Sequence, residues 1–317
     1  MPELLTSELI PTGPAERIAM GIRRRVLAHV LANDGGYMSQ ACSAAEILAT
    51  IYSGAVDLPD VDSPYEPPPF TAVPGRTTPR VSGAAPHGVP APGRDRLIIS
   101  PAHYALVVYA ALIECGRLAE RALDQFNQDG STVEMIGAEH SPGFETTTGS
   151  LAQAISQAGG IALARRLKGD TGRVWVFMSD GEFQEGQTWE ALAVISYHDL
   201  ANVRIVVDVN GAQCDGPMDT VMSIEPLTAR IESFGWSVDR VDGHDLVALR
   251  AAMTRSSDSP HAVLAYTDPA RGLELLNERR PMLHYLRLTS PAERERYAAA
   301  YAQLTDERPD GTGTSHR

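Results

Sequence analysis

The sequence predicts an α/β protein built on a parallel sheet with helices on both faces. The run RVWVFM (173–178) is apolar almost throughout, a helical pattern follows at 188–200, and a second apolar run, VRIVVDV (203–209), comes next. Strands of this kind are buried on both faces, and a helix is the usual connection between neighbouring parallel strands. Further strands are expected at 96–100, 236–241 and 261–267.

Helices are expected between and before these strands. Apolar side chains recur every four residues from Ile18 to Val30, which is the spacing of a helix with one buried face over 15–32. A second helix is expected to begin near Ser43, because Ser43 and Glu46 form a capping-box pattern ahead of an apolar run. Further helical patterns run over 103–115, 149–168 and 290–304.

The 317 residues, 43% of them hydrophobic, are enough for one large core. We expect an N-terminal extension at 1–14, a single domain at 15–303 and a mobile polar tail at 304–317. Within the domain, 57–94 is rich in proline and glycine, which interrupt helices and strands alike. This segment is expected to form a long surface insertion.

Composition argues against two classes of partner. A net charge of −13 leaves no cationic stripe for a phosphate backbone, so no nucleic acid partner is expected. The longest apolar run, 104–113, is too short to cross a bilayer, and the N-terminus lacks a signal-peptide pattern. We therefore expect no membrane association and a cytoplasmic location. The three cysteines form no metal-binding or disulfide motif.

Two polar residues follow neighbouring strands of the predicted sheet. Asp180 follows the first apolar run and Asn210 follows the second, so both should lie at the ligand-binding edge. A carboxylate and an amide oxygen suit Mg²⁺ or Ca²⁺, with diphosphate oxygens, water and carbonyls as further ligands. Gly181 would let the backbone approach that phosphate, near the start of a helix. Taken singly, Asp180-Gly181 and Asn210-Gly211 are also compatible with ordinary turns.

The two motifs together resemble a known signature. Asp180 and Asn210, thirty residues apart, match the thiamine-diphosphate motif that runs from GDG to an asparagine, with Ser179 in place of the first glycine. The stretch SDGEFQEGQTWEALAVISYHDLANVRIVVDVNGAQCDG resembles transketolases, especially the separate N-terminal subunits of split ones. So do IISPAHYALVVYAALIECG, GFETTTGSLAQAISQAGGIALARRLKG and GWSVDRVDGHDLVAL, and the similarity covers most of 15–290. It implies a thiamine-diphosphate-binding fold and thiamine diphosphate as the cofactor.

The resemblance assigns roles at the positions that match. The metal ion would be bound by Asp180, by the Asn210 side chain and by the backbone carbonyl of Ala212. Gly181 and Glu182 would lie against the diphosphate. The full set of implied cofactor-binding residues is His103, Gly149, Ser150, Leu151, Gly181, Glu182 and Asn210. For His103 and for 149–151, helix packing is the alternative.

Three residues are implied in catalysis. His103 would contact the diphosphate or the substrate. Glu185 matches a glutamate at the family's dimer interface that joins a carboxylate network, and its alternative is a solvated residue in the first turn of a helix. His284 lies near the place of a proton-transferring histidine, although only Gly272 of the preceding loop is recognisable. A structural role for His284 is an equal alternative.

The substrate side departs from the family. Tyr37 stands where transketolases carry a histidine that touches the hydroxyls of a ketose, and the short loop 137–142 leaves His140 without a match. Both changes spare the metal and diphosphate side. The donor therefore remains open between a ketose phosphate and a 2-oxo acid such as pyruvate, which would give acyloin-type products.

The resemblance also implies a partner. In the family a glutamate of a second domain activates the cofactor, so a C-terminal transketolase-like subunit should supply the pyrimidine-binding domain and that glutamate, within a heterotetramer. The pair would be a transferase that moves a two-carbon ketol or acyl unit to a carbonyl acceptor through a cofactor carbanion. One alternative is a non-catalytic scaffold or regulatory relative. Another, a nucleotide-binding enzyme, needs a GxGxxG or GxxxxGK[ST] loop, and the sequence contains neither.

Overall fold

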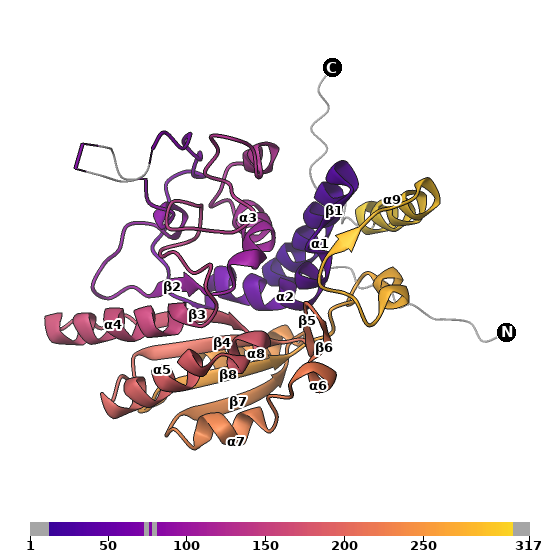
Figure 1. The fold of residues 1–317 in the computed structure, drawn as a ribbon. Helices are drawn as coiled ribbons and strands as arrows, with labels where there is room; N and C mark the ends of the chain where they lie inside the picture. Colours follow the sequence, from indigo (N-terminus) through magenta and orange to yellow (C-terminus); the bar gives the residue numbers. More distant parts are fainter. Residues whose placement is uncertain (1–12, 73–75, 78–80, 307–317) are drawn as a thin grey trace.

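The structure is a computed structural model that describes residues 13–72, 76–77 and 81–306. Its centre is a five-stranded sheet with the order β2-β3-β4-β8-β7, in which all neighbours are parallel (Figure 1). The strands are β2 (Arg96–Ile99), β3 (Val174–Ser179), β4 (Val203–Val209), β7 (Ser237–Asp242) and β8 (His261–Tyr266). The predicted parallel α/β fold is confirmed, and every expected strand is present within one residue of its predicted bounds.

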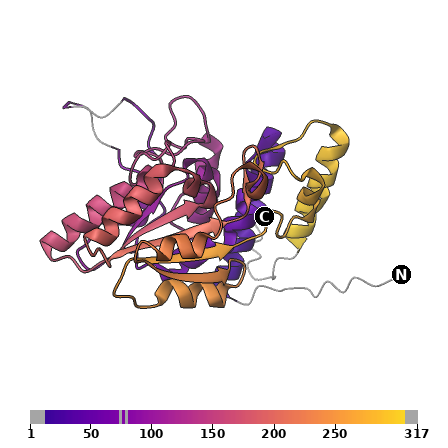
Figure 2. The same ribbon diagram turned by 60° about the horizontal axis from the view of Figure 1, so that its bottom comes forward.

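Alternate side chains of each strand enter two separate cores, one on each face of the sheet. Trp175 and Phe177 of β3 pack in the larger core, and Val176 and Met178 pack in the other. The larger core is covered by α1 (Pro14–Asn33), α2 (Met38–Thr50), α3 (Ala105–Glu114), α8 (Leu246–Thr254) and α9 (Pro291–Asp306). The second is covered by α4 (Gln153–Lys168), α5 (Gly186–Tyr197) and α7 (Leu227–Glu232), and the two helical layers are visible in Figures 1 and 2.

The N-terminal helices confirm one prediction and correct another. α1 has the buried apolar face that its four-residue spacing predicts. α2 begins at Met38, so the capping box expected at Ser43 and Glu46 is wrong. All of α2 is buried, and its polar side chains make interior contacts instead. Ser43 donates a hydrogen bond to Asp208 at 2.6 Å, and Glu46 forms an ion pair with Arg23.

Two predicted helices begin later than expected because the backbone ahead of them is not helical. α4 starts four residues after Gly149, since Ala152 has a left-handed φ of 67°. The helix expected from His103 is a 3-10 turn, η3 (Ala102–Tyr104), followed by α3. The loop expected after β3 contains a 3-10 turn, η5 (Asp180–Gln184), ahead of α5. All three departures lie at the carboxyl edge of the sheet.

The described part of the 57–94 insertion lies against the segment 117–143. Its regular structure is one turn, η2 (Ala85–His87), and a β-bridge from Tyr65 to Leu118. The Phe70 N–H donates to the Gly130 carbonyl at 2.8 Å. Most of the expected N-terminal extension and C-terminal tail lies outside the described residues, and α9 continues past the expected domain end at 303.

Short elements complete the fold. They are η1 (Ile51–Ala55), η4 (Ala122–Gln125), β5 (Ala212–Gln213), β6 (Gly216–Pro217), α6 (Met218–Val221) and η6 (Glu274–Arg279). In addition, β1 (Gly35–Gly36) pairs antiparallel with β9 (Leu286–Arg287), which brings Tyr37 and His284 to one corner of the molecule. Among the helices that the structure describes, none combines the length and the apolar character needed to cross a membrane.

Candidate active site

A cavity of about 420 Å³ opens at the carboxyl edge of the sheet, beside the ends of β3 and β4. Nine of the predicted site residues line it: His103, Gly149, Leu151, Asp180, Gly181, Glu185, Asn210, Ala212 and His284. Residues that are up to 181 positions apart in the sequence therefore meet at one site. Ser150 and Glu182 were also predicted there, but neither residue lines the cavity.

Asp180 is a buried carboxyl group on the cavity wall, with 1% of its surface exposed. Its Oδ2 accepts a hydrogen bond from the Gly211 N–H at 2.8 Å, which links the turn after β3 to the turn after β4. Burial, and secondarily the neighbouring Asp208, raise the pKa of Asp180 to about 8. A positive charge in the cavity would reverse this shift, because it would favour the ionised form.

Asn210 is oriented by a buried polar cluster. Its Nδ2 donates to Asp208 Oδ2 and to the Tyr104 hydroxyl, both at 3.2 Å. Asp208 also accepts hydrogen bonds from Ser43 at 2.6 Å, Tyr104 at 2.8 Å and Thr267 at 2.5 Å, while burial raises its pKa. Because the amide nitrogen faces Asp208, Asn210 Oδ1 faces the other way, where it accepts the Ala212 N–H at 2.9 Å.

Gly181 borders open space, whereas the side chain of the next residue, Glu182, is buried. A Cβ atom added to Gly181 would meet nothing within 4 Å, so there is open space in front of this backbone. The Glu182 carboxylate is fully buried and accepts hydrogen bonds from Ser179 N–H at 2.8 Å, from Ala152 N–H at 3.1 Å and from the Ser100 hydroxyl. These donors hold the Glu182 side chain inside the protein. Glu182 as a cofactor-binding residue stays a prediction.

The segment 149–151 crosses the rim of the cavity. Gly149 and Leu151 line it, whereas Ser150 is exposed beside them. The N–H of the following residue, Ala152, is fixed by Glu182, which explains how a non-glycine residue holds the left-handed conformation there. Ser150 as a cofactor-binding residue stays a prediction.

Two imidazoles on another part of the wall form an aromatic cluster with a phenol that lies outside the cavity lining. The His103 and His284 rings lie 5.3 Å apart, and Tyr37 contacts both, at 5.9 and 5.5 Å between ring centroids. Burial, followed by the nearby His284, lowers the pKa of His103 to about 4, and burial also lowers the pKa of His284. Both imidazoles are therefore neutral at neutral pH.

Glu185 and His140 occupy more peripheral positions. Glu185 is exposed on the cavity rim, where it is the residue that precedes α5. His140 lies outside the cavity lining, 3.0 Å from Glu134 and with its ring 4.8 Å from that of Phe70. The role of Glu185 stays a prediction, and His140 is placed against the insertion.

Sequence reasoning missed Gln40 and the function of Asp208. Gln40 lines the cavity and donates to the His284 carbonyl at 3.1 Å. It follows Tyr37 by three positions, which is nearly one helical turn, so the pattern could have indicated it. No pattern in the sequence indicated the role of Asp208. A strand sequence does not show which hydroxyl groups from distant segments will surround one of its side chains.

The fold and the cavity define an α/β enzyme domain whose ligand site lies at the carboxyl edge of a doubly covered parallel sheet. Comparison with known proteins identifies the family within this class. The family model described as "Transketolase, thiamine diphosphate binding domain" matches residues 80–266. The chain therefore belongs to the transketolase family and carries its thiamine-diphosphate-binding domain.

Three relatives show the range of similarity. A transketolase family protein of Sinorhizobium fredii is 35% identical over 85% of this chain and 89% of its own length. A 6-deoxy-6-sulfo-D-fructose transketolase subunit of Clostridium sp. (strain MSTE9) is 32% identical over 70% of this chain and 80% of its own length. The crystal structure of Campylobacter jejuni transketolase matches 93% of the chain with a TM-score of 0.71 at 20% identity, and the chain spans 48% of that protein.

Proposed function

We propose that this chain is the diphosphate-binding component of a two-component enzyme that transfers a two-carbon ketol or acyl unit to a carbonyl acceptor. The observation that supports this most strongly is one cavity that contains Asp180, Asn210 and Ala212 together with the imidazoles of His103 and His284. The first three suit a metal-bound diphosphate, and the imidazoles suit a polar donor substrate.

The donor set fits a divalent cation, for which we propose Mg²⁺, with Ca²⁺ as the alternative. None of the ion pairs between described residues involves Asp180, although the group is buried. Asn210 Oδ1 and the Ala212 carbonyl would add an amide oxygen and a backbone oxygen. The described residues contain no cluster of three His, Cys, Asp or Glu side chains. A mixed oxygen set completed by the diphosphate is therefore what this chain offers.

Thiamine diphosphate supplies a carbanion and an electron sink when it is bound. The residues of this chain would bind and orient. The open space before Gly181 would admit a phosphate group close to the backbone. As neutral groups, His103 and His284 would each offer one N–H and one lone pair to the donor substrate. We infer that Tyr37, whose ring packs against both imidazoles, holds them in place at the donor end of the cavity.

A partner subunit with a pyrimidine-binding domain and an activating glutamate would complete the site. Apolar side chains remain exposed at or beside the cavity wall, among them Ile136, Met222 and Tyr285, with 44, 51 and 36% of their surfaces exposed. An apolar rim of this kind suits a covering surface. We further propose a heterotetramer in the cytoplasm, in which the exposed Glu185 faces a second copy of this chain.

The residues that line the same cavity also bear on the chemical class of the donor substrate. His103, His284 and Gln40 provide neutral polar groups, and no Lys or Arg is among the lining residues that the structure describes. A phosphate group on the substrate would therefore need cationic side chains from the partner. A 2-oxo acid, which has a single carboxylate, would need fewer cationic side chains. We keep a ketose donor as the first proposal because of the family. A decarboxylating acyloin-forming ligase is favoured as the second by Tyr37, which replaces a sugar-binding histidine.

Calorimetric titration of thiamine diphosphate with Mg²⁺, into the chain alone and into its mixture with a candidate partner, tests the proposal. We expect micromolar binding in the mixture and a loss of at least 100-fold in Asp180→Asn, because the metal would lose its charged ligand. The matched control is Asp124→Asn, an exposed carboxylate on η4 that should have no effect. Wild-type binding that Asp180→Asn leaves intact would refute the assigned site. No binding in any mixture of folded proteins would favour the non-catalytic scaffold.

A further inference from the structure

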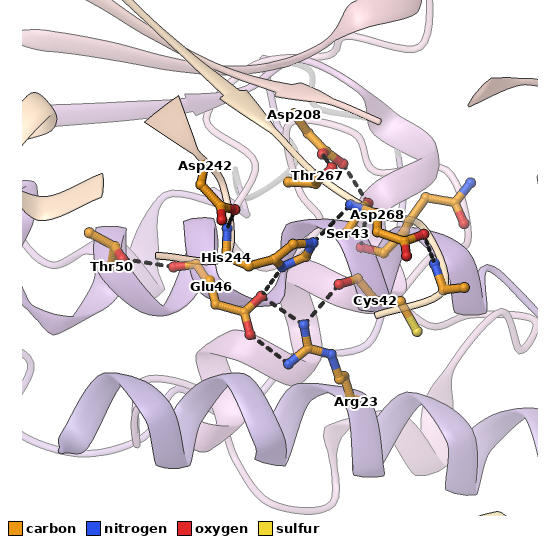
Figure 3. A network of polar contacts seen from close by, with 12 residues as sticks. Arg23, Cys42, Ser43, Glu46, Thr50, Asp208, Asp242, His244, Thr267 and Asp268 are labelled. Carbon is orange, nitrogen blue, oxygen red and sulfur yellow. Dashed lines mark hydrogen bonds and ion pairs between the residues drawn. The ribbon is translucent and has the colours of Figure 1, made fainter. Parts of the chain in front are cut away.

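The turn between β7 and α8 contains a histidine that connects two parts of the interior. His244 belongs to the sequence VDGHD, and 11% of its side chain is exposed. Its Nδ1 lies 2.9 Å from Glu46 Oε2 of α2, and its Nε2 lies 2.8 Å from the backbone nitrogen of Asp268, in the loop after β8 (Figure 3). The imidazole therefore bridges a helix in one core and a loop at the carboxyl edge of the sheet.

The two contacts determine where the imidazole carries its proton. A backbone N–H only donates, so Nε2 must be the unprotonated acceptor toward Asp268. Nδ1 then carries the hydrogen and donates to Glu46. Glu46 is itself held by two hydrogen bonds of 2.7 Å from the Arg23 guanidinium. A bidentate pair of this kind fixes the carboxylate, and through it the ring of His244 (Figure 3).

The loop that His244 holds leads directly to the cavity. Thr267 donates to Asp208 Oδ1 at 2.5 Å, and Asp208 orients Asn210. Pro269, two residues further along, lines the cavity. The segment 267–269 thus contributes Pro269 to the cavity wall. Through Thr267 it also donates a hydrogen bond to the carboxylate that orients Asn210, a proposed metal ligand.

The far end of the same loop lies close to the Arg23 side chain. Gly272 has a φ of +75°, and a Cβ atom there would lie 3.1 Å from Arg23 Cδ and 3.3 Å from Nε. Only glycine combines this conformation with so close an approach. Arg23 therefore meets the loop at two places, through Glu46 and His244 at Asp268, and by close approach at Gly272.

We propose that His244 is a positioning residue that fixes the loop 267–272 and, through Thr267 and Asp208, the Asn210 side of the cofactor cavity. This inference has two parts. The cofactor arm, an effect of His244 on cofactor binding, rests on the function proposed above. The loop arm, an effect of His244 on the loop 267–272, does not. His244 lines no part of the cavity among the described residues and has no contact with Asp180, Asn210 or Ala212, so it would act only through the loop.

Two substitutions separate loop positioning from general stability. His244→Asn places an amide near the position of Nδ1, so it keeps a donor toward Glu46 and loses the acceptor for the Asp268 N–H. His244→Gln places its amide near the position of Nε2, so it keeps an acceptor for Asp268 and loses the donor. Both variants lose one hydrogen bond, and a merely structural role predicts equal effects.

Hydrogen exchange measured by mass spectrometry on the full chain decides the loop arm. We expect exchange in the peptide that covers 265–272 to become about tenfold faster in His244→Asn and to change less than about twofold in His244→Gln. The matched control is His261→Asn, which removes a 3.0 Å contact between a buried imidazole and Asp239 at the opposite end of β8. This control should leave exchange in 265–272 unchanged. Equal acceleration in both His244 variants, acceleration throughout the chain, or no acceleration would overturn the proposal.

Titration of thiamine diphosphate with Mg²⁺ into the chain and its partner decides the cofactor arm. The dissociation constant should rise about tenfold in His244→Asn and less than about twofold in His244→Gln and His261→Asn. Unchanged affinity in His244→Asn would overturn this arm. If the wild-type mixture binds no thiamine diphosphate, the proposed function fails, and the exchange measurement still decides whether His244 positions the loop.

Discussion

The buried pair between Arg23 and Glu46 gives a quantitative prediction for stability. Their side chains are 8 and 11% exposed, and Glu46 also accepts a hydrogen bond from His244. Burial alone would raise the pKa of Glu46, but Arg23 and then His244 outweigh it and lower the pKa to about 2. Glu46→Gln would keep the shape of the side chain and remove its charge, which leaves the Arg23 guanidinium buried without a counter-charge.

Two independent routes give similar magnitudes for this substitution. A lowering of the Glu46 pKa from 4.5 to about 2 corresponds to about 3 kcal/mol of stability at neutral pH. Breaking a buried ion pair by removing one partner typically costs about 3–5 kcal/mol. We therefore expect Glu46→Gln to lower the free energy of unfolding by about 3–5 kcal/mol at pH 7.

The pH dependence has a definite sign. The folded-state pKa of Glu46 is depressed, so its contribution is fully present above the unfolded pKa of 4.5 and is lost as the pH falls through about 2. Urea denaturation of wild type and Glu46→Gln should show a constant difference from pH 5 to 7 and a smaller one at lower pH. The control is Asp124→Asn, whose exposed pair with Arg121 should contribute less than about 1 kcal/mol. A loss below about 1 kcal/mol for Glu46→Gln, or a difference that does not shrink in acid, would refute the reasoning.

Three further changes test other parts of the site. Asp208→Ala should weaken thiamine diphosphate and Mg²⁺ binding about tenfold in calorimetry, because the Asn210 amide loses its acceptor; unchanged affinity would contradict the orienting role. Tyr37→His should raise kcat/KM for ketose phosphates about tenfold relative to pyruvate in the assembled enzyme, and no gain would count against a sugar donor. Phe70→Ala should cost about 1 kcal/mol in thermal unfolding, through its ring contact with His140, without changing cofactor affinity. A weakened affinity would show that the insertion does shape the cavity.

The sheet and the approximate site were predictable from the sequence, because the residues that follow parallel strands lie at one edge of the sheet. An apolar run fixes a buried strand, and a parallel sheet brings the carboxyl ends of its strands together. Asp180 and Asn210 follow adjacent strands, so their approach through the Gly211 N–H follows from topology alone. The motif spacing then pointed to the family that the comparisons show.

The direction of individual side chains was not predictable in the same way. Glu182 follows Asp180 by two residues, yet its carboxylate turns inward because Ser100, Ser179 and Ala152 supply donors there. Ser43 and Glu46 resembled a helix cap because a fully buried helix has no polar face to mark its true start at 38. Apart from Ser179, the deciding partners lie far away in the sequence, such as Ser100 and Ala152 for Glu182 and Asp208 for Ser43, and a local pattern carries no information about them.

The protein buries carboxyl groups in two ways, and the difference separates structure from function. Glu46 is matched by Arg23, and its pKa falls. At the carboxyl edge of the sheet, burial raises the pKa of Asp180, Glu182 and Asp208, and none of the ion pairs between described residues includes them. Glu182 and Asp208 are served by side-chain and backbone donors and hold turns in place. Of these three, Asp180 alone lines the cavity, so it is the group whose unfavourable burial a bound cation would relieve.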